Sequence, residues 1–511
     1  MSFDALKGWS SAQKHVVAAS YLGWTLDAFD FFLLVFVIKD VAGEFGTAVS
    51  SIALAVTLTL ALRPVGAFIF GRLADRFGRR PILMLDVALY SVLGFATAFA
   101  PNLTAFLIIR ALFGVAMGGE WGIGASLTME TVKPEARGMV SGLLQSGYPS
   151  GYLIASVAFA LLYPHIGWRG MFMIGIAPAL LTFYILKNVK ESPSWTPKIH
   201  ANGDTLAGLT AYGRLIGYAL LLWIGTQYAD QPAVAGIAVG ACVISSIVLA
   251  ARNPALWFEF FAVVAMLLVD YFHMVQGAIP LPMAIIYNAA AVLAGAFLKD
   301  HWRMGIYAVL VMTAFNFFSH GTQDLYPTFL QVQQQYSPAT VGIIAVIYNI
   351  GAILGSLTFG SLSERIGRRR AMVIAALISL PVLPLWALAG SPLWFAVGSF
   401  LMQFMVQAAW GIVPVHLNEL SPATVRGTFP GFVYQLGNLL ASVNATIQAD
   451  YAAAHNNDYA TALMMVAGGS AIAISLLVWF GVERKGVHLD TGAAPATPAR
   501  VAATMAPQAQ Q

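Results

Sequence analysis

The sequence predicts an all-α polytopic membrane protein with two pseudo-symmetric halves of six helices each and extra membrane segments between them. Composition is the first observation behind this prediction. Of the 511 residues, 59% are hydrophobic and only 10% are charged, whereas soluble domains carry about 25% charged residues. A surface so poor in charge excludes soluble enzymes, disordered proteins and nucleic-acid binders, and it favours a lipid bilayer as the surroundings.

An internal repeat is the second observation. Residues 71–80 read GRLADRFGRR, and residues 360–369, which lie 289 positions later, read GSLSERIGRR. Further matches at the same spacing are Trp121 with Trp410, Glu130 with Glu419, Arg137 with Arg426 and Gly138 with Gly427. Separated matches at one spacing indicate two homologous halves, and such repeats are typical of transporters.

Apolar stretches long enough to cross a bilayer recur along the chain, since a membrane helix needs about 20 apolar residues. In the first half we expect them near 17–38, 48–71, 81–99, 103–128, 138–162 and 168–187. In the second half we expect them near 304–330, 337–361, 370–389, 392–417, 427–448 and 460–482. The first span contains Asp27 and Asp30 and lacks the cleavage site of a signal peptide, so we expect it to be retained.

Residues 196–300 form a central insert with further apolar runs. These runs lie near 208–228, 232–251, 255–270 and 278–298. Because the repeated arginine-rich loops must lie on one side of the membrane, the insert crosses an even number of times. Four crossings give about 16 spans in the whole chain, and the alternative of two crossings gives 14. The run that contains Glu259 is the one we most expect to be re-entrant or interfacial.

Basic residues set the orientation of the chain. They gather in the loops after the second and fourth spans and in the matching loop of the second half, so these loops and both termini are expected in the cytoplasm.

The expected domains are an N-terminal half (1–195), the insert (196–300), a C-terminal half (301–486) and a disordered cytoplasmic tail (487–511). The lack of a targeting peptide and the simple topology favour the inner (plasma) membrane of a prokaryote. We expect a monomer.

Cysteine and histidine usage argues against metal or redox chemistry. The single cysteine, Cys242, excludes an intramolecular disulfide, and the nine histidines are scattered along the chain. We therefore expect neither a cofactor nor a metal, and no enzymatic activity. His273 falls in a predicted outer loop, where we expect it to be inert.

The repeated GRLADRFGRR loop resembles the loop signature of the major facilitator superfamily, and this resemblance covers nearly the whole chain apart from the insert and the tail. In that family, charged contacts of these loops hold one access state closed. The resemblance therefore implies gating by the charged residues of both loops and their neighbours. These residues are Asp75, Arg76, Arg80, Glu130, Arg137, Glu364, Arg365, Glu419 and Arg426. The alternative is that the charges only fix the topology.

Ionisable residues inside the spans are functional candidates, because a charge within a bilayer is costly. They are Asp27, Asp30, Arg63, Asp86, Arg110, Glu120, His320 and Asp324. For three of them a structural role is an open alternative: Asp86 can pair with the arginine-rich loop, Arg110 can anchor packing, and Glu120 can be a neutral acid in a tight helix contact.

The seventh span is the most informative of these. A period of 3.6 residues places Asn316, His320, Gln323 and Asp324 on one helix face. His320 and Asp324 are four positions apart and can hydrogen-bond, so they form a candidate proton site together with Asp27 and Asp30. Asp30 and Asn316 stand in similar sequence runs and are expected to be pseudo-symmetric.

The run from Asn316 to Thr328 resembles the signature of the Jen-type carboxylate permeases, which are lactate- and pyruvate-proton symporters in the sialate:proton symporter branch of the superfamily. Its specified positions are Asn316, Ser319, His320, Thr322, Gln323, Asp324 and Thr328. The same resemblance assigns substrate contacts to Arg63 and to the span-eleven run that contains Gln435 and Asn438.

This chemistry suits a small carboxylate. Arg63 can bind a carboxylate through two parallel hydrogen bonds, and Asn316, Gln323 and Gln435 supply amide donors. We therefore expect proton-coupled symport of a lactate- or pyruvate-type monocarboxylate by alternating access. Sialic acid, a dicarboxylate or another organic acid remains an alternative within the same fold. A transporter-like nutrient sensor is the alternative from another class.

Overall fold

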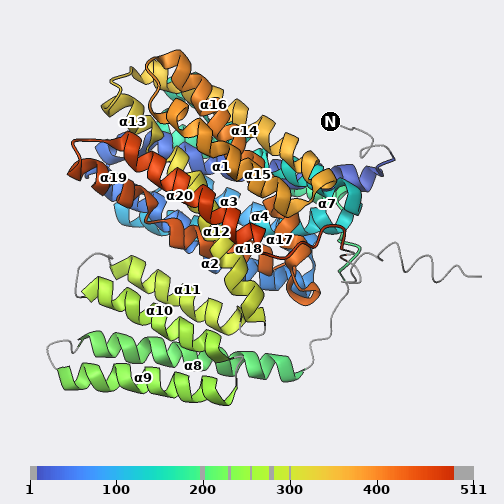
Figure 1. Ribbon diagram of the computed structural model, residues 1–511, viewed down its shortest axis with the longest axis vertical. Coiled ribbons are helices and arrows are strands. Elements are labelled where there is room, and N and C mark those ends of the chain that lie inside the picture. The colour runs from blue at the N-terminus through green and yellow to red at the C-terminus, as the bar shows by residue number, and fades with distance from the viewer. Residues whose placement is uncertain are drawn as a thin grey trace, which may run out of the picture.

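The computed structural model describes residues 8–195, 202–227, 232–253, 256–274, 281–298, 301–487 and 489. Within these ranges the chain is entirely helical, which confirms the all-α prediction, and its long helices run roughly parallel (Figure 1). The N-terminal half consists of α1 (Ser11–Glu44), α2 (Val49–Phe77), α3 (Arg79–Thr97), α4 (Leu103–Thr131), α5 (Arg137–Gln145), α6 (Gly147–Ile174) and α7 (Ala179–Asn188). The insert consists of α8 (Asn202–Gln227), α9 (Pro232–Arg252), α10 (Trp257–Met274) and α11 (Leu281–Leu298). The C-terminal half consists of α12 (Trp302–Gln323), α13 (Tyr326–Val332), α14 (Pro338–Ile366), α15 (Arg368–Ala387), α16 (Pro392–Trp410), α17 (Val413–Leu420), α18 (Phe429–Ala441), α19 (Asn444–Ala454) and α20 (Tyr459–Trp479).

Among the described residues, 11 helical segments are long and apolar enough to cross a membrane. Several predicted spans are pairs of helices rather than single ones. The predicted span at 304–330 is α12 followed by α13, because Pro327 has no N–H to continue the hydrogen-bond ladder. The predicted spans on either side of residue 167 meet inside α6, which breaks where Gly167 adopts φ of 61°.

The two halves repeat their conformation at the arginine-rich loops. Gly78, between α2 and α3, has φ of 106°, and Gly367, between α14 and α15, has φ of 96°. A glutamate then holds the start of the helix that follows each glycine. Glu191 accepts from the backbone N–H of Arg79 at 2.9 Å, and Glu483 accepts from that of Arg369 at 3.0 Å. The repeat found in the sequence is therefore a repeat of backbone geometry.

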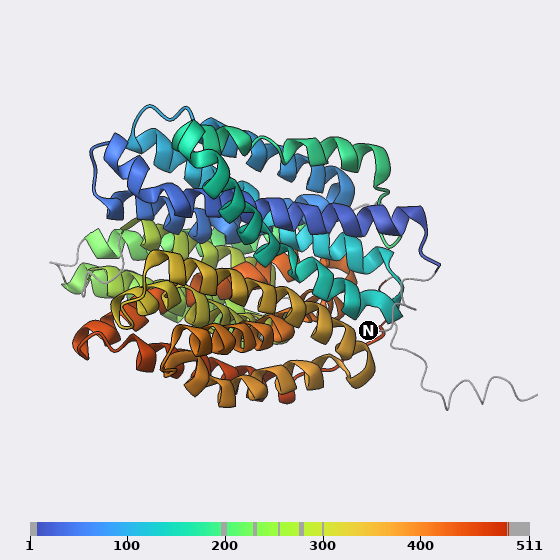
Figure 2. The same ribbon diagram turned by 90° about the horizontal axis from the view of Figure 1, so that it is seen from above.

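The halves lie side by side, as the view from above shows (Figure 2). They touch closely on the side of the arginine-rich loops, where glycine lets backbones approach. A Cβ added at Gly71 would lie 2.6 Å from the Cα of Thr428, and one at Gly122 would lie 2.7 Å from the Cα of Gly431. These glycines allow the N-terminal and C-terminal halves to seal against each other at this end.

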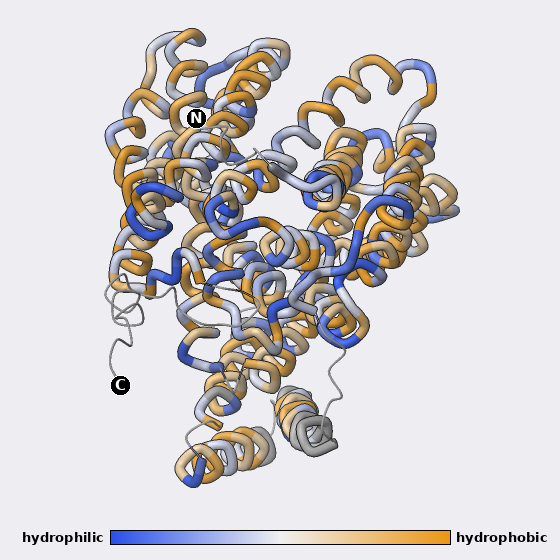
Figure 3. The backbone as a smooth tube through the Cα atoms, turned by 90° about the vertical axis from the view of Figure 1, so that its right-hand side faces the viewer, coloured by the Kyte–Doolittle hydropathy of each residue, from blue (hydrophilic) through white to orange (hydrophobic). Residues whose placement is uncertain are grey.

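Hydrophobic residues recur along the helices (Figure 3), and large apolar side chains are exposed on the outside of the bundle. Leu180, Phe183 and Leu161 are 65–70% exposed on the first half, and Leu393 is 69% exposed on the second. Large apolar side chains without cover are expected where a protein faces lipid tails.

The insert forms a separate layer with its own small core, and α11 is the helix of this layer that lies nearest to the two halves (Figure 1). At its edge the buried carboxylate of Glu259 pairs with Arg214, which is 34% exposed, and the atoms Oε1 and Nη2 are 2.7 Å apart. The helix that carries Glu259, α10, is continuous over 18 residues, and a re-entrant or interfacial position of this segment stays a prediction. His273 lies in its last turn rather than in a loop.

Candidate functional site

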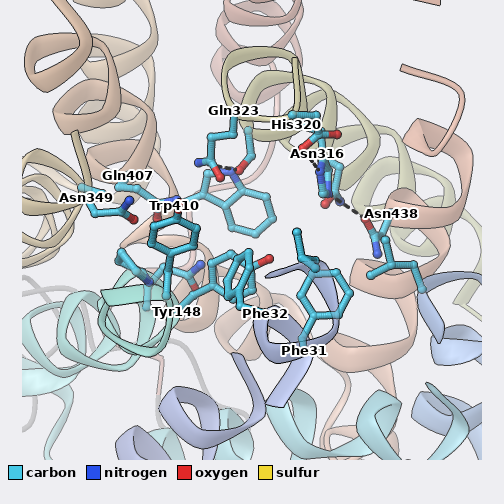
Figure 4. A pocket seen from close by; sticks show the side chains of 18 of the residues that line it. Phe31, Phe32, Tyr148, Asn316, His320, Gln323, Asn349, Gln407, Trp410 and Asn438 are labelled. Atoms are coloured by element: carbon cyan, nitrogen blue, oxygen red, sulfur yellow. Dashed lines mark hydrogen bonds and ion pairs between the residues drawn. The ribbon is translucent and has the colours of Figure 1, made fainter. Parts of the chain in front are cut away.

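A cavity of about 340 Å³ lies between the two halves (Figure 4). It is closed on the side of the loops at 71–80 and 360–369, where the halves meet. With these loops in the cytoplasm, as the positive-inside rule predicts, the cavity faces outward. One wall is aromatic, a feature that the sequence reasoning missed because these rings do not stand out in an apolar chain. The aromatic residues include Trp24, Phe31, Phe32, Tyr148, Trp410 and Tyr434.

Most of the residues predicted to bind substrate meet in this cavity, although they come from different helices. Arg63 of α2, Asn316 and Gln323 of α12 and Asn438 of α18 all line it. Gln435 does not; it lies behind Asn438, whose Nδ2 is 3.4 Å from the Oε1 of Gln435. Gln145, Asn349 and Gln407 also line the cavity and were not predicted.

Arg63 is the cation of the cavity, and it is only 2% exposed. Its guanidinium lies over the ring of Phe31 at 5.4 Å, and its Nη2 donates to the sulfur of Met117 at 3.0 Å. The nearest carboxylate oxygen, from Asp27, is 3.8 Å from Nη2, which is too long for a strong hydrogen bond. A thioether is a weak acceptor. The guanidinium is thus poorly satisfied by the protein and is suited to bind an anion.

His320 stands at the centre of a short hydrogen-bonded chain. Its Nδ1 is 3.1 Å from Asp324 Oδ1, and its Nε2 is 3.1 Å from Asn438 Oδ1. The amide nitrogen of Asn438 faces Gln435, which leaves the amide oxygen for the imidazole. Both ring nitrogens therefore face acceptor oxygens, an arrangement that a doubly protonated, positively charged imidazole satisfies. The pair lies at the cavity wall, since the side chains of His320 and Asp324 are 28% and 38% exposed.

The two acids predicted in the first span lie away from the cavity surface. Asp27 and Asp30 are 0% and 2% exposed, and their carboxylate oxygens have no hydrogen-bond partner among the described residues. Asp30 instead lies close to the backbone of Gly94 and Gly175. The expected pseudo-symmetry with Asn316 is wrong in this respect, because Asn316 lines the cavity. The two are 286 positions apart, whereas the repeat has a spacing of 289, so the repeat pairs Asn316 with Asp27 rather than with Asp30.

Three further intramembrane groups are buried inside the N-terminal half. Asp86 is completely buried and does not reach the arginine-rich loop; its Oδ1 lies beside Gly119. The expected pairing with that loop is therefore wrong, because the carboxylate points into the bundle. Glu120 packs against Gly23, as expected for an acid in a tight helix contact. Arg110 lies over the ring of Phe113 at 4.0 Å, and its guanidinium nitrogens have no hydrogen-bond partner among the described residues.

On the loop side, Asp75 bridges the two halves. Its Oδ1 accepts from the backbone N–H of Gly427 at 2.8 Å, and its Oδ2 accepts from the hydroxyl of Thr428 at 2.6 Å. Arg79 lies against it, with Nη1 3.2 Å from Asp75 Oδ1 and Nη2 3.3 Å from Glu130 Oε1.

The second half repeats this arrangement in the opposite direction. Glu364 accepts from the backbone N–H of Gly138 in the first half. Arg368 lies 2.9 Å from Glu364 and binds both carboxylate oxygens of Glu419 at 3.1 Å. Two acids, one from each half, thus hold the start of a helix in the other half.

The structure revises which arginines belong to this network. Arg76 and Arg365 are exposed, and Arg80 donates to the carbonyl of Leu186 within its own half. The arginines that pair with Asp75 and Glu364 are Arg79 and Arg368, which are buried and were not predicted to take part in gating. The repeat does not single them out, since Arg76 and Arg365 are also 289 positions apart.

The remaining predicted arginines bind the chain that follows α20. Arg137 Nη1 donates to the carbonyl of Val487 at 2.7 Å, and Arg426 Nη1 donates to that of Leu489 at 2.5 Å. Arg426 Nη1 also lies 3.7 Å from Glu130. Val487 and Leu489 are buried, so these two positions of the predicted disordered tail are packed between the halves. Its other positions lie outside the described residues.

Comparison with known proteins agrees with this architecture. The sequence model of the Major Facilitator Superfamily matches residues 21–324 and 309–506. A carboxylic acid transporter protein homolog of Saccharomyces cerevisiae is 27% identical over 91% of this chain and 67% of its own length. The sialic acid transporter NanX of Escherichia coli is 23% identical over 93% of this chain and 95% of its own.

Among solved structures, the proton:xylose symporter XylE shares the fold with a TM-score of 0.62 and 16% identity, over 94% of this chain and 98% of its own. The two relatives bear out the resemblance to the Jen-type permeases and their sialate-transporting neighbours. Since the family model matches both halves, the chain belongs to the Major Facilitator Superfamily.

Proposed function

We propose that this protein is a secondary active transporter that carries a small monocarboxylate of the lactate or pyruvate type together with a proton, by alternating access. The observation that carries the proposal is the presence in one cavity of an underused buried guanidinium, Arg63, and a titratable pair, His320 and Asp324. The guanidinium is suited to the carboxylate, and the pair is suited to the proton.

Charge explains why the two ligands move together. An anion that enters a low-dielectric cavity is costly unless a cation pairs with it, and closing the cavity around unpaired charge is costlier still. A proton on the His320–Asp324 pair offsets the charge of the acid before the halves close. Because the protonated state favours closure, substrate movement is linked to proton movement.

The name of a relative supports the ligand class: the yeast protein is described as a carboxylic acid transporter homolog. A second candidate, a larger organic acid, is favoured by the aromatic wall and by the sialic acid transporter among the relatives. A transporter-like sensor is a further alternative. Net uptake of an acid in a transport assay would argue against it.

Uptake by proteoliposomes that contain the purified protein tests the proposal. Lactate or pyruvate added outside should enter and make the outer medium more alkaline. Collapsing the proton gradient should abolish accumulation; uptake that is indifferent to the gradient would remove the coupling. Competition by a panel of small and large acids separates the monocarboxylate from the larger candidates.

A further inference from the structure

A second, smaller cavity of about 90 Å³ adjoins the first one. Helices α2, α11, α12 and α18 surround it. Its floor is apolar, and two hydroxyl groups, from Thr57 and Ser442, lie at its exposed rim. The apolar lining residues are Leu60, Ala61, Met283, Leu439 and Ala441.

The two cavities share a wall. Leu60, His320, Asp324 and Asn438 line both of them, so the proton-binding pair that faces the main cavity also faces the smaller one. A molecule held by Arg63 in the main cavity therefore lies next to an apolar recess.

Helix α11 of the insert forms the wall of this recess that faces away from the two halves. Met283 of α11 lines it and is only 8% exposed. One turn further along α11, the hydroxyl of Tyr287 lies 2.8 Å from that of Ser442, which ties α11 to the end of α18. The insert thus supplies a wall that the two six-helix halves do not supply themselves.

We propose that this recess is a side-chain subsite, which takes the apolar substituent of an organic acid whose carboxylate lies on Arg63, and that Met283 sets the length of substituent that fits. The inference rests on the transport of carboxylates proposed above. A volume of about 90 Å³ is several times the roughly 10–15 Å³ that a cavity needs to hold one water molecule, which leaves room for a short alkyl group such as propyl.

The apolar lining explains the chemistry of the substituent. Leu60, Leu439 and Met283 offer a charged or strongly polar group no hydrogen-bond partner for the hydration that it loses against them. The polar groups of the recess lie at its rim and in the wall that it shares with the main cavity. An alkyl group gains about 0.8 kcal/mol for each methylene that it buries, which corresponds to about fourfold in binding. The expected preference is therefore for hydroxy or oxo acids with a short alkyl chain over their counterparts with a polar chain.

Two alanine substitutions on α11 test the inference in proteoliposomes. The probes are lactate and its longer straight-chain homologues, hydroxypentanoate and hydroxyhexanoate, which carry the hydroxyl beside the carboxylate as lactate does. Met283→Ala enlarges the recess, whereas Ile285→Ala, which also removes three heavy atoms, changes a residue that is 55% exposed on the outer surface. We expect Met283→Ala to lower the KM for hydroxyhexanoate relative to that for lactate by about fourfold or more, from the methylenes it admits. The Ile285→Ala variant should keep the wild-type ratio.

A filling variant gives the opposite expectation. Ala441→Leu should raise the KM for hydroxypentanoate relative to that for lactate by at least about fourfold. If both recess variants leave the ratio of the longer acid to lactate unchanged, or if Ile285→Ala changes it as much as Met283→Ala, the subsite assignment is wrong. Failure of the wild-type protein to take up any of these acids would instead overturn the proposed function.

Discussion

Asp75 in the N-terminal half accepts hydrogen bonds from both the backbone N–H and the hydroxyl of Thr428 in the C-terminal half, at 3.1 and 2.6 Å. Its counterpart in the repeat, Glu364, accepts from the backbone of Gly138 in the first half. Each half thus contributes one carboxylate to a seal that must separate before the cavity can open to the other side. Arg79 and Arg368 hold these carboxylates in place through ion pairs.

Asp75→Asn should weaken this seal and shift the protein toward the state that opens on the loop side. The amide has one oxygen, so it cannot accept both sets of hydrogen bonds that the two carboxylate oxygens of Asp75 accept. A hydrogen bond to a charged group contributes about 1.5–3 kcal/mol, so the ratio of the two states should change by roughly 10- to 150-fold. The measurement is labelling of a cysteine placed at Ser319, which lines the cavity. An impermeant maleimide added on the outside should react more slowly in the variant.

The matched control is Asp450→Asn, which changes an exposed carboxylate on α19. It should leave the labelling rate as in the parent. The parent has a single other cysteine, Cys242, which is buried. Unchanged labelling of the Asp75→Asn variant would mean that Asp75 does not hold the outward-facing state.

Much of the fold could be predicted from the sequence, because the charged loops repeat and lipid demands long apolar helices. The polar face of α12 was also predictable, since Asn316, His320 and Gln323 follow helical spacing. Contacts between distant helices were not. The burial of Arg79 rather than Arg76, and the distance of Asp30 from the cavity, depend on how helices rotate against one another, and a single sequence does not report that rotation.

The same limit applies to the insert and the chain after α20. Nothing in the amino-acid sequence around Met283 distinguishes a residue that lines a recess from one that faces lipid. The Ala/Pro-rich tail predicts disorder, yet Val487 and Leu489 are buried because Arg137 and Arg426 bind their carbonyls.

Arg63→Lys should impair substrate binding although it preserves the charge. An ammonium cannot form the two parallel hydrogen bonds that a guanidinium forms with a carboxylate. Loss of one charge-assisted hydrogen bond of about 1.5–3 kcal/mol predicts a KM for lactate that is roughly 10- to 150-fold higher. Uptake kinetics in proteoliposomes measure this. Arg303→Lys, at an exposed arginine, is the control and should keep the parent KM; equal KM values for both variants would contradict a role of Arg63 in binding.

His320→Gln should separate substrate exchange from proton coupling. The glutamine can still hydrogen-bond Asn438, but it does not carry a proton. Net lactate uptake driven by a proton gradient should fall to the level seen without a gradient, because the variant has no imidazole to carry the proton. Exchange of labelled for unlabelled lactate at equal pH should persist. His455→Gln, at an exposed histidine of the α19 end, should change neither rate. If exchange falls as much as net uptake, His320 binds substrate rather than the proton.

Val487→Asp should destabilise the contact between the halves on the loop side. The Val487 side chain is 7% exposed, and the segment that carries it lies against Glu364 and Glu419 as well as Arg137. Burying an imperfectly paired charge costs several kcal/mol, so the midpoint of thermal unfolding in detergent should fall by several degrees. Val482→Asp, at a position that is 46% exposed, should have a much smaller effect. If the two variants unfold at the same temperature, the segment after α20 is not part of the seal. A lower midpoint for Val487→Asp that is matched by slower maleimide labelling of the Ser319 cysteine would show instead that this segment, together with Asp75, keeps the cavity open to the outside.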